Sequence, residues 1–306
     1  MNSGWTYIDQ IKPASAGQTV LSYYTQRYWH SSATVWKGRI QQGDILLNGQ
    51  PVSPQRVLSG GEKLTYYRLP WQEPNAPLDF EILYEDEDLW AIAKPAGLPV
   101  LPGGGFLEHT LLHQMRQRYP NEAPAPVHRL GRGTSGVMLV ARSPLAKRGL
   151  SQQFRKRQMT KVYRALIGPT EPSLLAEKFT CTYPIGKLPH PRLGYLYGHV
   201  PHSKSSLAAQ SHGQIVQRMP HSTLLDVSIV TGRPHQIRIH LAAAGYPLLG
   251  DPLYGVGGYP LADMATMPGE CGYHLHAHRL QFLHPGSGET VLIAAEPPAA
   301  LQSAAL

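Results

Sequence analysis

The sequence predicts a protein of the α+β class, with a small N-terminal module and a larger C-terminal domain. Its 306 residues are enough for two domains of ordinary size. The stretch 71–78 is punctuated by proline and is typical of a linker. From residue 79 onward, short apolar strand patterns alternate with amphipathic helix patterns, which favours a mixed, largely antiparallel sheet with flanking helices. We therefore expect domains at 1–72 and 73–306.

The N-terminal module carries strong turn signals. Asn48-Gly49 lies between two apolar runs and predicts a two-residue hairpin. Gly60-Gly61 predicts a second turn, and the strand pattern of residues 64–67 follows it. The helical pattern at 36–40 completes the order helix, Gly-Asp pair, strand, turn, strand. This order resembles the S4 RNA-binding domain, although the helix that is usually basic in that domain carries few basic residues here. A generic small α/β module is the alternative.

The first half of the C-terminal domain alternates strands with helices. Two apolar runs flank the acidic turn 85–88, and residues 136–142 form a continuous apolar strand pattern. A helix is expected over 109–120, with Leu111, Leu112 and Met115 on its inner face. Another should begin at Ser143-Pro144, an N-cap followed by proline, and run to about Arg157. Its predicted inward residues are Leu145, Leu150 and Phe154.

The second half has further strand patterns at 161–167, 224–230 and 274–284. A helix is predicted to start at 231–234 and to continue through Ala244, with Gly245 ending it. Together these elements imply an α+β domain with a mixed sheet covered by helices.

Composition excludes several classes of protein. Hydrophobic residues make up 42% of the chain and charged residues 16%, so it is not a disordered chain. No apolar run reaches the roughly 18 residues of a membrane span, and no signal-peptide pattern is visible. The two cysteines lie far apart, which argues against a disulfide framework. We therefore expect a soluble, cytoplasmic protein.

The charge is distributed unevenly along the chain. The formal net charge is +8, and the 48 residues between Glu122 and Glu171 contain ten Lys or Arg and no carboxylate. Seven acidic residues fall within residues 73–88, and a second acid-free stretch runs from Lys178 to Leu225. A solvated surface is the ordinary explanation for a single charge cluster. A stretch this long and this basic instead favours RNA phosphate as a partner.

Five segments resemble the RluA-type pseudouridine synthases in order and spacing. They are 85–100, 127–143 (VHRLGRGTSGVMLVARS), 161–167 (KVYRALI), 231–255 (TGRPHQIRIHLAAAGYPLLGDPLYG) and 276–289. The resemblance implies the pseudouridine synthase fold with a central RNA-binding cleft. It implies an isomerase that converts uridine to pseudouridine in ribosomal or transfer RNA, with no cofactor and no metal. The target base must leave its stack to be reached.

The same resemblance assigns roles to individual residues. It places Arg129 in the space that the flipped base vacates, Tyr163 against the flipped uracil, and Arg238 beside the family's catalytic aspartate. We expect further RNA contacts from the motif loop (128–136, HRLGRGTSG), from the basic helix expected between Ser143 and about Arg157, and from the segment after residue 230. These candidates are His128, Arg129, Arg132, Thr134, Ser135, Arg155, Lys156, Arg157, Lys161, Arg233 and His235.

One position departs from the family pattern. The motif continues His128-Arg129-Leu130-Gly131, so glycine stands where the resemblance places the catalytic aspartate. Glycine has no side chain and can serve neither as nucleophile nor as acid or base. Loss of a covalent nucleophile costs on the order of a million-fold in a well-studied hydrolase. The alternative function is therefore an RNA-binding pseudoenzyme of the same fold.

Without that aspartate, Arg238 needs another partner, because an unpaired buried cation is strongly destabilising. A carboxylate from elsewhere, water or RNA phosphate could fill the role. Asp251 is the nearest candidate by motif, although its Gly-Asp pair belongs to the family pattern in its own right.

Two other features have plainer interpretations. His274, His276 and His278 have the spacing of a metal cluster on one strand face, but the run lies where the family has an ordinary strand, so no metal is expected. For His128 we favour a hydrogen-bonding role within its loop over direct catalysis.

Overall fold

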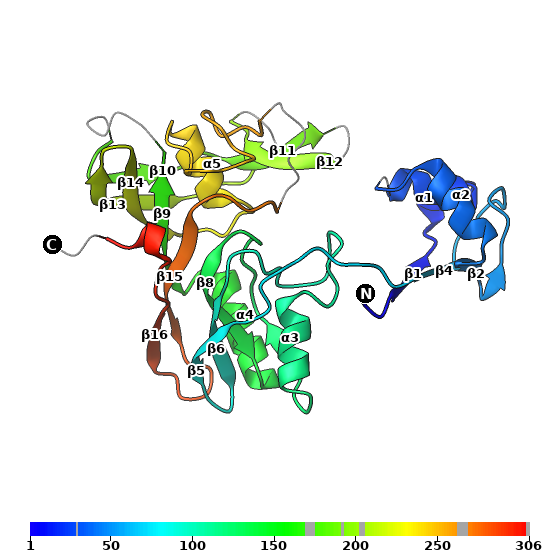
Figure 1. The fold of residues 1–306 in the computed structure, drawn as a ribbon, viewed down its shortest axis with the longest axis horizontal. Coiled ribbons are helices and arrows are strands. Elements are labelled where there is room, and N and C mark those ends of the chain that lie inside the picture. Colours follow the sequence, from blue (N-terminus) through cyan, green and yellow to red (C-terminus); the bar gives the residue numbers. More distant parts are fainter. Residues whose placement is uncertain (29, 169–174, 191–192, 202–205, 262–268, 304–306) are drawn as a thin grey trace. The chain divides into compact units, whose positions relative to one another are not determined.

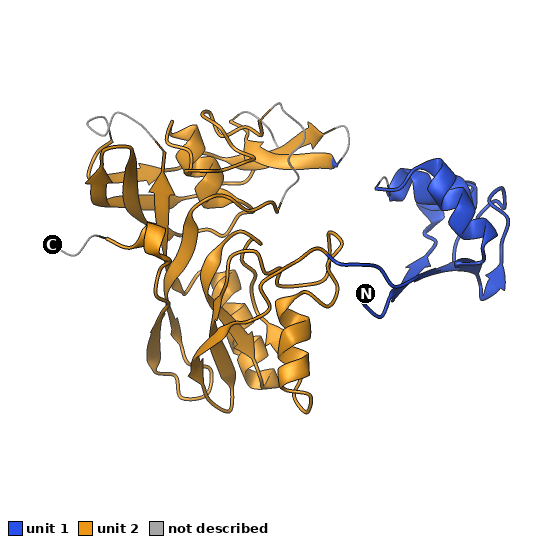
Figure 2. Ribbon diagram, in the orientation of Figure 1, with its two compact units in different colours: residues 1–73, 191–193 blue, residues 74–190, 194–306 orange. Residues whose placement is uncertain are grey.

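The computed structural model describes the chain except residues 29, 169–174, 191–192, 202–205, 262–268 and 304–306 (Figure 1). It divides into two compact units, one built from residues 1–73 and one from residues 74–190 and 194–306 (Figure 2). The first unit ends at Glu73, because Asn2 donates a hydrogen bond to its carboxylate over 2.8 Å and also accepts one from the Trp71 amide. Among the described residues, no helix is long and apolar enough to span a bilayer.

The first unit is a four-stranded antiparallel sheet in the order β1-β4-β2-β3 with two helices. Its core packs Tyr24 and Trp36 from the helices against Ile45 and Leu64 from the strands. The predicted Asn48-Gly49 turn is confirmed, with φ of 49° and 83°. The elements are β1 (Trp5–Gln10), α1 (Val20–Arg27), α2 (Ala33–Gln41), β2 (Ile45–Leu47), β3 (Gln50–Pro51) and β4 (Lys63–Arg68).

The second unit is organised around one ten-stranded sheet. Its main path runs β10-β13-β14-β9-β15-β8-β6-β5, with β16 paired to β15 and β7 paired to β8. All pairs are antiparallel except β15 with β8, which meet only at Ser135–Gly136. The strands are β5 (Glu81–Glu85), β6 (Leu89–Lys94), β7 (Ala125–Pro126), β8 (Ser135–Ala141), β9 (Thr160–Ile167), β10 (Lys178–Cys181), β13 (Ser211–Met219), β14 (Ser222–Ile229), β15 (Leu275–Leu283) and β16 (Thr290–Ala294). A separate hairpin pairs β11 (Ile185–His190) with β12 (Gly194–His199).

Three helices cover this sheet on opposite faces, as strand alternation dictates. In β8, Met138 and Val140 pack on α3 (Leu111–Arg118), whereas Val137 and Leu139 pack on α4 (Pro144–Lys156). The third helix, α5 (Gln236–Ala243), packs on β9 and β14 beside the cluster that α3 covers. The fold class predicted from the sequence is thus confirmed.

Two helix predictions need correction. The helix expected over 231–244 begins only at Gln236, because Pro234 and the positive φ of His235 (55°) hold the preceding turn out of helical geometry. In α4, the Ser143 cap and Pro144 start are confirmed, but Leu145 points outward and is half exposed. Leu150 is buried and Phe154 packs against the same cluster, as expected, whereas Ala146 takes the inward place expected for Leu145 because alanine lets the helix approach the sheet closely.

Candidate functional site

One residue from each of three neighbouring central strands marks the position of the candidate site. Tyr163 of β9 pairs with Ala277 of β15, which pairs with Gly136 of β8. Gly136 has φ of 109°, and a Cβ there would lie 2.2 Å from the Ala277 carbonyl oxygen, so only glycine fits. The HRLGRGTSG loop therefore enters the sheet one strand away from Tyr163, with β15 between them.

Tyr163 lies on the face of the sheet that α3 and α5 cover. Its half-buried ring contacts both hydrophobic clusters of that face, the one containing Leu130 and the one containing Ile237 and Tyr273. Burial raises the pKa of Tyr163 to about 12, so its hydroxyl is protonated at neutral pH. The predicted position of Tyr163 against a flipped base stays a prediction.

Arg238 is brought by α5 into a buried ion pair with Asp251. Its Nε and one terminal nitrogen donate to the two carboxylate oxygens over 2.7 and 2.6 Å, and the side chains are 4% and 1% exposed. Burial disfavours the charge of Arg238, but the hydrogen bond and charge of Asp251 outweigh it and raise the arginine pKa. Of the three partners considered for Arg238, the structure shows the carboxylate from elsewhere.

Asp251 is itself fully engaged. Oδ1, which accepts from the terminal nitrogen of Arg238, also accepts the amides of Leu253 and Tyr254 over 2.9 and 3.1 Å. A carboxylate held by two arginine donors and two backbone amides is a poor nucleophile and a poor base. Asp251 therefore neutralises and orients Arg238.

The loop before β8 separates exposed from buried side chains. Arg129 is exposed and Leu130 is buried. His128 stacks on Phe154 with ring centroids 4.4 Å apart, and its Nε2 accepts the Leu139 amide over 2.9 Å. Burial lowers the pKa of His128 to about 3, so the imidazole is neutral and serves the loop, as we favoured.

The two hydroxyl residues of the loop face the protein interior. Thr134 Oγ1 is hydrogen-bonded to the Tyr273 hydroxyl over 3.1 Å, and Ser135 Oγ to His276 Nδ1 over 2.8 Å. Both residues are buried, so an RNA contact through either hydroxyl would first require these bonds to break. His276 and His278 both contact the Ala295 carbonyl and serve the strand in this way.

Lys94 is a buried residue of the site that the sequence did not single out. It is 1% exposed, and its Nζ donates to the carbonyls of Pro95, Leu98 and Arg132, which match the three donors of an ammonium group. Burial lowers the Lys94 pKa to about 7. Its position at the Lys-Pro-Ala-Gly corner was the available signal. Through the Arg132 carbonyl it holds the loop that carries Gly131.

Some of the remaining candidate RNA-binding residues contact other parts of the protein, and others are exposed at the end of α4. Arg132 donates from Nε to the Gly269 carbonyl over 2.5 Å, and Arg233 donates to the Ala208 carbonyl over 3.2 Å. His235 contacts the Tyr254 hydroxyl over 2.8 Å, and burial lowers its pKa to about 4. Lys161 is half-buried, with its pKa lowered first by burial and then by Arg157. Exposed residues Arg155, Lys156 and Arg157 end α4 on the opposite sheet face from Tyr163.

Carboxylates from distant segments neutralise part of the acid-free stretch. Arg142 pairs with Glu85 and Glu122 over 2.9 and 2.7 Å, and Arg164 pairs with Asp226 over 2.8 Å. The basic surface is therefore smaller than the sequence suggested.

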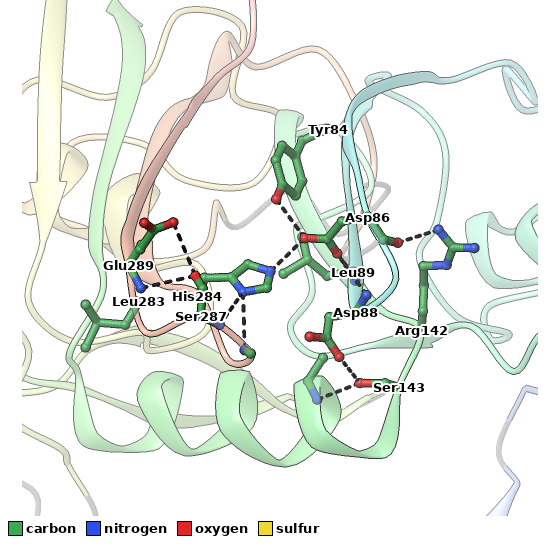
Figure 3. A network of polar contacts seen from close by, with 12 residues as sticks. Tyr84, Asp86, Asp88, Leu89, Arg142, Ser143, Leu283, His284, Ser287 and Glu289 are labelled. Atoms are coloured by element: carbon green, nitrogen blue, oxygen red, sulfur yellow. Dashed lines mark hydrogen bonds and ion pairs between the residues drawn. The ribbon is translucent and has the colours of Figure 1, made fainter.

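The acidic turn at 85–88 is hydrogen-bonded to other parts of the fold, so it is more than a solvated cluster of charge. Figure 3 shows Asp86 accepting from the Tyr84 hydroxyl and from His284 Nε2, and Asp88 accepting from the Ser143 hydroxyl. Asp86 also accepts the amides of Asp88 and Leu89. These bonds tie the β5–β6 turn to the start of α4 and to the β15–β16 turn.

Comparison with solved structures shows the fold. Human RNA pseudouridylate synthase domain containing 1 aligns with a TM-score of 0.57 at 22% identity, covering 74% of this chain and 87% of that one. Human RNA pseudouridylate synthase domain containing 4 aligns with a TM-score of 0.54 at 23% identity, covering 72% and 89%. The architecture is therefore that of the RNA pseudouridine synthases, a class of RNA-modifying isomerases.

Comparison with sequences shows the family. The family model described as RNA pseudouridylate synthase matches residues 88–243. An uncharacterized RNA pseudouridine synthase of Synechocystis is 51% identical over 91% of this chain and 94% of its own length. RNA pseudouridine synthase 5 of rice is 38% identical over 99% and 89%. Ribosomal large subunit pseudouridine synthase D of Neisseria meningitidis is 34% identical over 91% and 75%. The chain belongs to the RluA-type RNA pseudouridine synthase family of isomerases, whose substrate is RNA.

Proposed function

We propose that the protein isomerises uridine to pseudouridine in ribosomal RNA. The observation that carries the proposal is that Tyr163 and the Arg238–Asp251 pair lie on one face of the sheet, with Tyr163 packed near Leu130 of the motif loop. The choice of ribosomal over transfer RNA rests on the name of the Neisseria relative. We further propose that the first unit is an S4-like module that binds the same RNA, supported by its helix, strand, Asn-Gly turn and strand order.

The proposed reaction is a balanced rearrangement. The bond between C1′ and N1 of uridine breaks, the uracil turns, and a new bond forms between C1′ and C5. C5 loses a proton and N1 gains one, so no net proton, electron or cofactor is consumed. In this scheme exposed Arg129 occupies the space of the flipped base, and Tyr163 packs against the uracil. The Arg238–Asp251 pair forms a rigid, buried support beside Tyr273 and the motif loop.

Gly131 supports the second candidate function, an RNA-binding pseudoenzyme. The residue cannot act as nucleophile or base, and the Asp251 carboxylate is occupied by Arg238 and two amides. In that case the protein would bind its RNA target without changing the base.

The test incubates the full chain with ribosomal and transfer RNA transcripts and maps pseudouridine at single-nucleotide resolution. We expect product in ribosomal RNA from the unaltered protein, and none from Arg238→Met. Arg148→Gln, a change at an exposed residue on the far face of α4, is the matched control and should keep full activity. RNA that binds without gaining pseudouridine would establish the pseudoenzyme, and product only in transfer RNA would contradict the assigned substrate.

The exposed basic end of α4 should contact RNA phosphate outside the pocket. Arg155, Lys156 and Arg157 lie on the opposite sheet face from Tyr163. Replacing all three by glutamine is expected to make the slope of log K against log salt shallower by about 2, since each phosphate contact contributes about 0.7–0.9. The rate at saturating RNA should not change. Fluorescence-anisotropy titrations at several salt concentrations measure the slope.

Arg129→Gln is the contrasting variant, because Arg129 lies in the motif loop. It should slow the reaction at saturating RNA. An unchanged salt slope in the triple variant would show that the end of α4 does not bind phosphate.

A further inference from the structure

Tyr273 lies where the motif loop and the buried arginine meet. It lies two residues before the start of β15, is 6% exposed, and places its ring over the Arg238 guanidinium, 4.1 Å from ring centroid to Cζ. Its hydroxyl is hydrogen-bonded to Thr134 Oγ1 over 3.1 Å. Nε and one terminal nitrogen of Arg238 donate to Asp251, and the guanidinium also lies over the Tyr254 ring at 5.0 Å, farther than the Tyr273 ring.

Two glycines of the loop make room for this ring. A Cβ on Gly131 would lie 2.9 Å from the Tyr273 hydroxyl oxygen and 3.4 Å from Thr134 Oγ1. A Cβ on Gly133 would lie 2.9 and 3.0 Å from carbons of the same ring. Neither glycine has a positive φ, so the backbone alone would accept another residue at both positions. At Gly131 the space that Tyr273 occupies explains the glycine, and at Gly133 the same ring does so together with the Cα of Cys271, 3.2 Å from the added Cβ.

We propose that Tyr273 is the active-site positioning residue of this protein, with its hydroxyl standing in the space that a side chain at 131 would fill, above Arg238. Gly131 and Tyr273 then form a complementary pair. The ring helps to hold Arg238 in place, and the hydroxyl fixes the loop through Thr134. The ring also screens the arginine from solvent. The expected effect of Tyr273 on the reaction rate rests on the proposed function. Its contacts with the loop and with Arg238 rest on packing alone.

A double-mutant cycle between positions 131 and 273 tests the packing of Tyr273 independently of the reaction. Gly131→Ala should lower the melting temperature by about 2–4 °C, as expected for about 1 kcal/mol in a unit of this size. In a Tyr273→Phe background the hydroxyl is gone, so Gly131→Ala should cost almost nothing further. Gly133→Ala is the matched control, because its Cβ meets ring carbons that phenylalanine retains. It should cost the same in both backgrounds.

The catalytic part is tested by single-turnover pseudouridine formation at saturating RNA. Tyr273→Phe should slow the reaction about 10- to 100-fold, the effect of a small misplacement of the reacting groups, while RNA affinity stays within twofold. A merely structural tyrosine would leave this rate unchanged once the protein is folded. Tyr273→Leu, which removes the ring over Arg238, should lose more activity than Tyr273→Phe.

The outcomes separate the two proposals. An unaltered protein that binds RNA and makes no pseudouridine overturns the proposed function and, with it, the catalytic role of Tyr273. An active unaltered protein with an equally active Tyr273→Phe variant overturns the inference alone. If Gly131→Ala lowers the melting temperature equally in both backgrounds, the proposed fit between Gly131 and the Tyr273 hydroxyl is refuted.

Discussion

Asp251→Asn is expected to lower the free energy of unfolding of the second unit by about 3–5 kcal/mol, the cost of leaving one member of a buried ion pair uncompensated. The side chains of Arg238 and Asp251 are 4% and 1% exposed, so little water reaches the stranded guanidinium. A domain is stable by only about 5–15 kcal/mol, which makes this loss a large fraction of the total. Urea unfolding followed by circular dichroism measures it. Pseudouridine formation should be lost as well.

The matched control is Asp226→Asn. Asp226 pairs with Arg164 and Arg279 but is 21% exposed, so its loss should cost less than half as much. The double variant Arg238→Met with Asp251→Leu should regain much of the stability, because no buried charge is left unpaired. It should not regain activity. If Asp251→Asn proved as mild as Asp226→Asn, the buried pair would not hold α5 to the 250–254 turn.

Acidification from pH 6.5 to about 4 is expected to destabilise the second unit steeply. Burial lowers the pKa of both His235 and His240 from 6.5 to about 4. Between these values the unfolded chain binds protons that the folded protein does not, so stability is present above pH 6.5 and falls as pH falls. Each histidine contributes about 1.4 kcal/mol per pH unit. His128, with its pKa lowered by burial to about 3, extends the effect further.

His240 is the residue with which to test this. It is fully buried, its Nε2 donates to the Tyr183 carbonyl over 2.9 Å, and its Nδ1 accepts from Ser211 over 3.0 Å, which suits the neutral imidazole. His240→Gln should therefore reduce the loss of stability between pH 7 and 5, whatever its stability at pH 7. His212→Gln, at an exposed position, controls for removal of an imidazole. An unaltered pH dependence in His240→Gln would show that this histidine does not drive acid unfolding.

Local sequence signals predicted the local structure well. The Asn48-Gly49 turn, the Ser143-Pro144 helix start and the strand at 160–167 all depend on neighbouring residues, whose conformational preferences act over a few positions. Leu145 was wrongly predicted to face inward in α4, because the choice between Leu145 and Ala146 depends on how closely the sheet approaches; Leu150 and Phe154 were predicted correctly. The first strand, Trp5–Gln10, escaped prediction because its mostly exposed residues show no alternation of apolar and polar types.

The charge pattern shows the limit of such signals. The sequence places no carboxylate between Glu122 and Glu171, yet Arg142 and Arg164 of that stretch are paired with Glu85, Glu122 and Asp226. These partners come from other strands and turns of the sheet, so spacing along the chain could not reveal them.

The sequence by itself determined the family, the fold class and the absence of a carboxylate at Gly131, because motifs and side-chain chemistry are properties of the chain. Only the tertiary structure decided what surrounds that glycine. It brought Asp251 to Arg238 and laid the Tyr273 ring across Gly131 and Gly133. Tyr273 follows the loop by more than a hundred residues, and only the pairing of β15 with β8 and β9 places it there. Close contact between distant segments is a property of packing, and packing is settled by the whole fold.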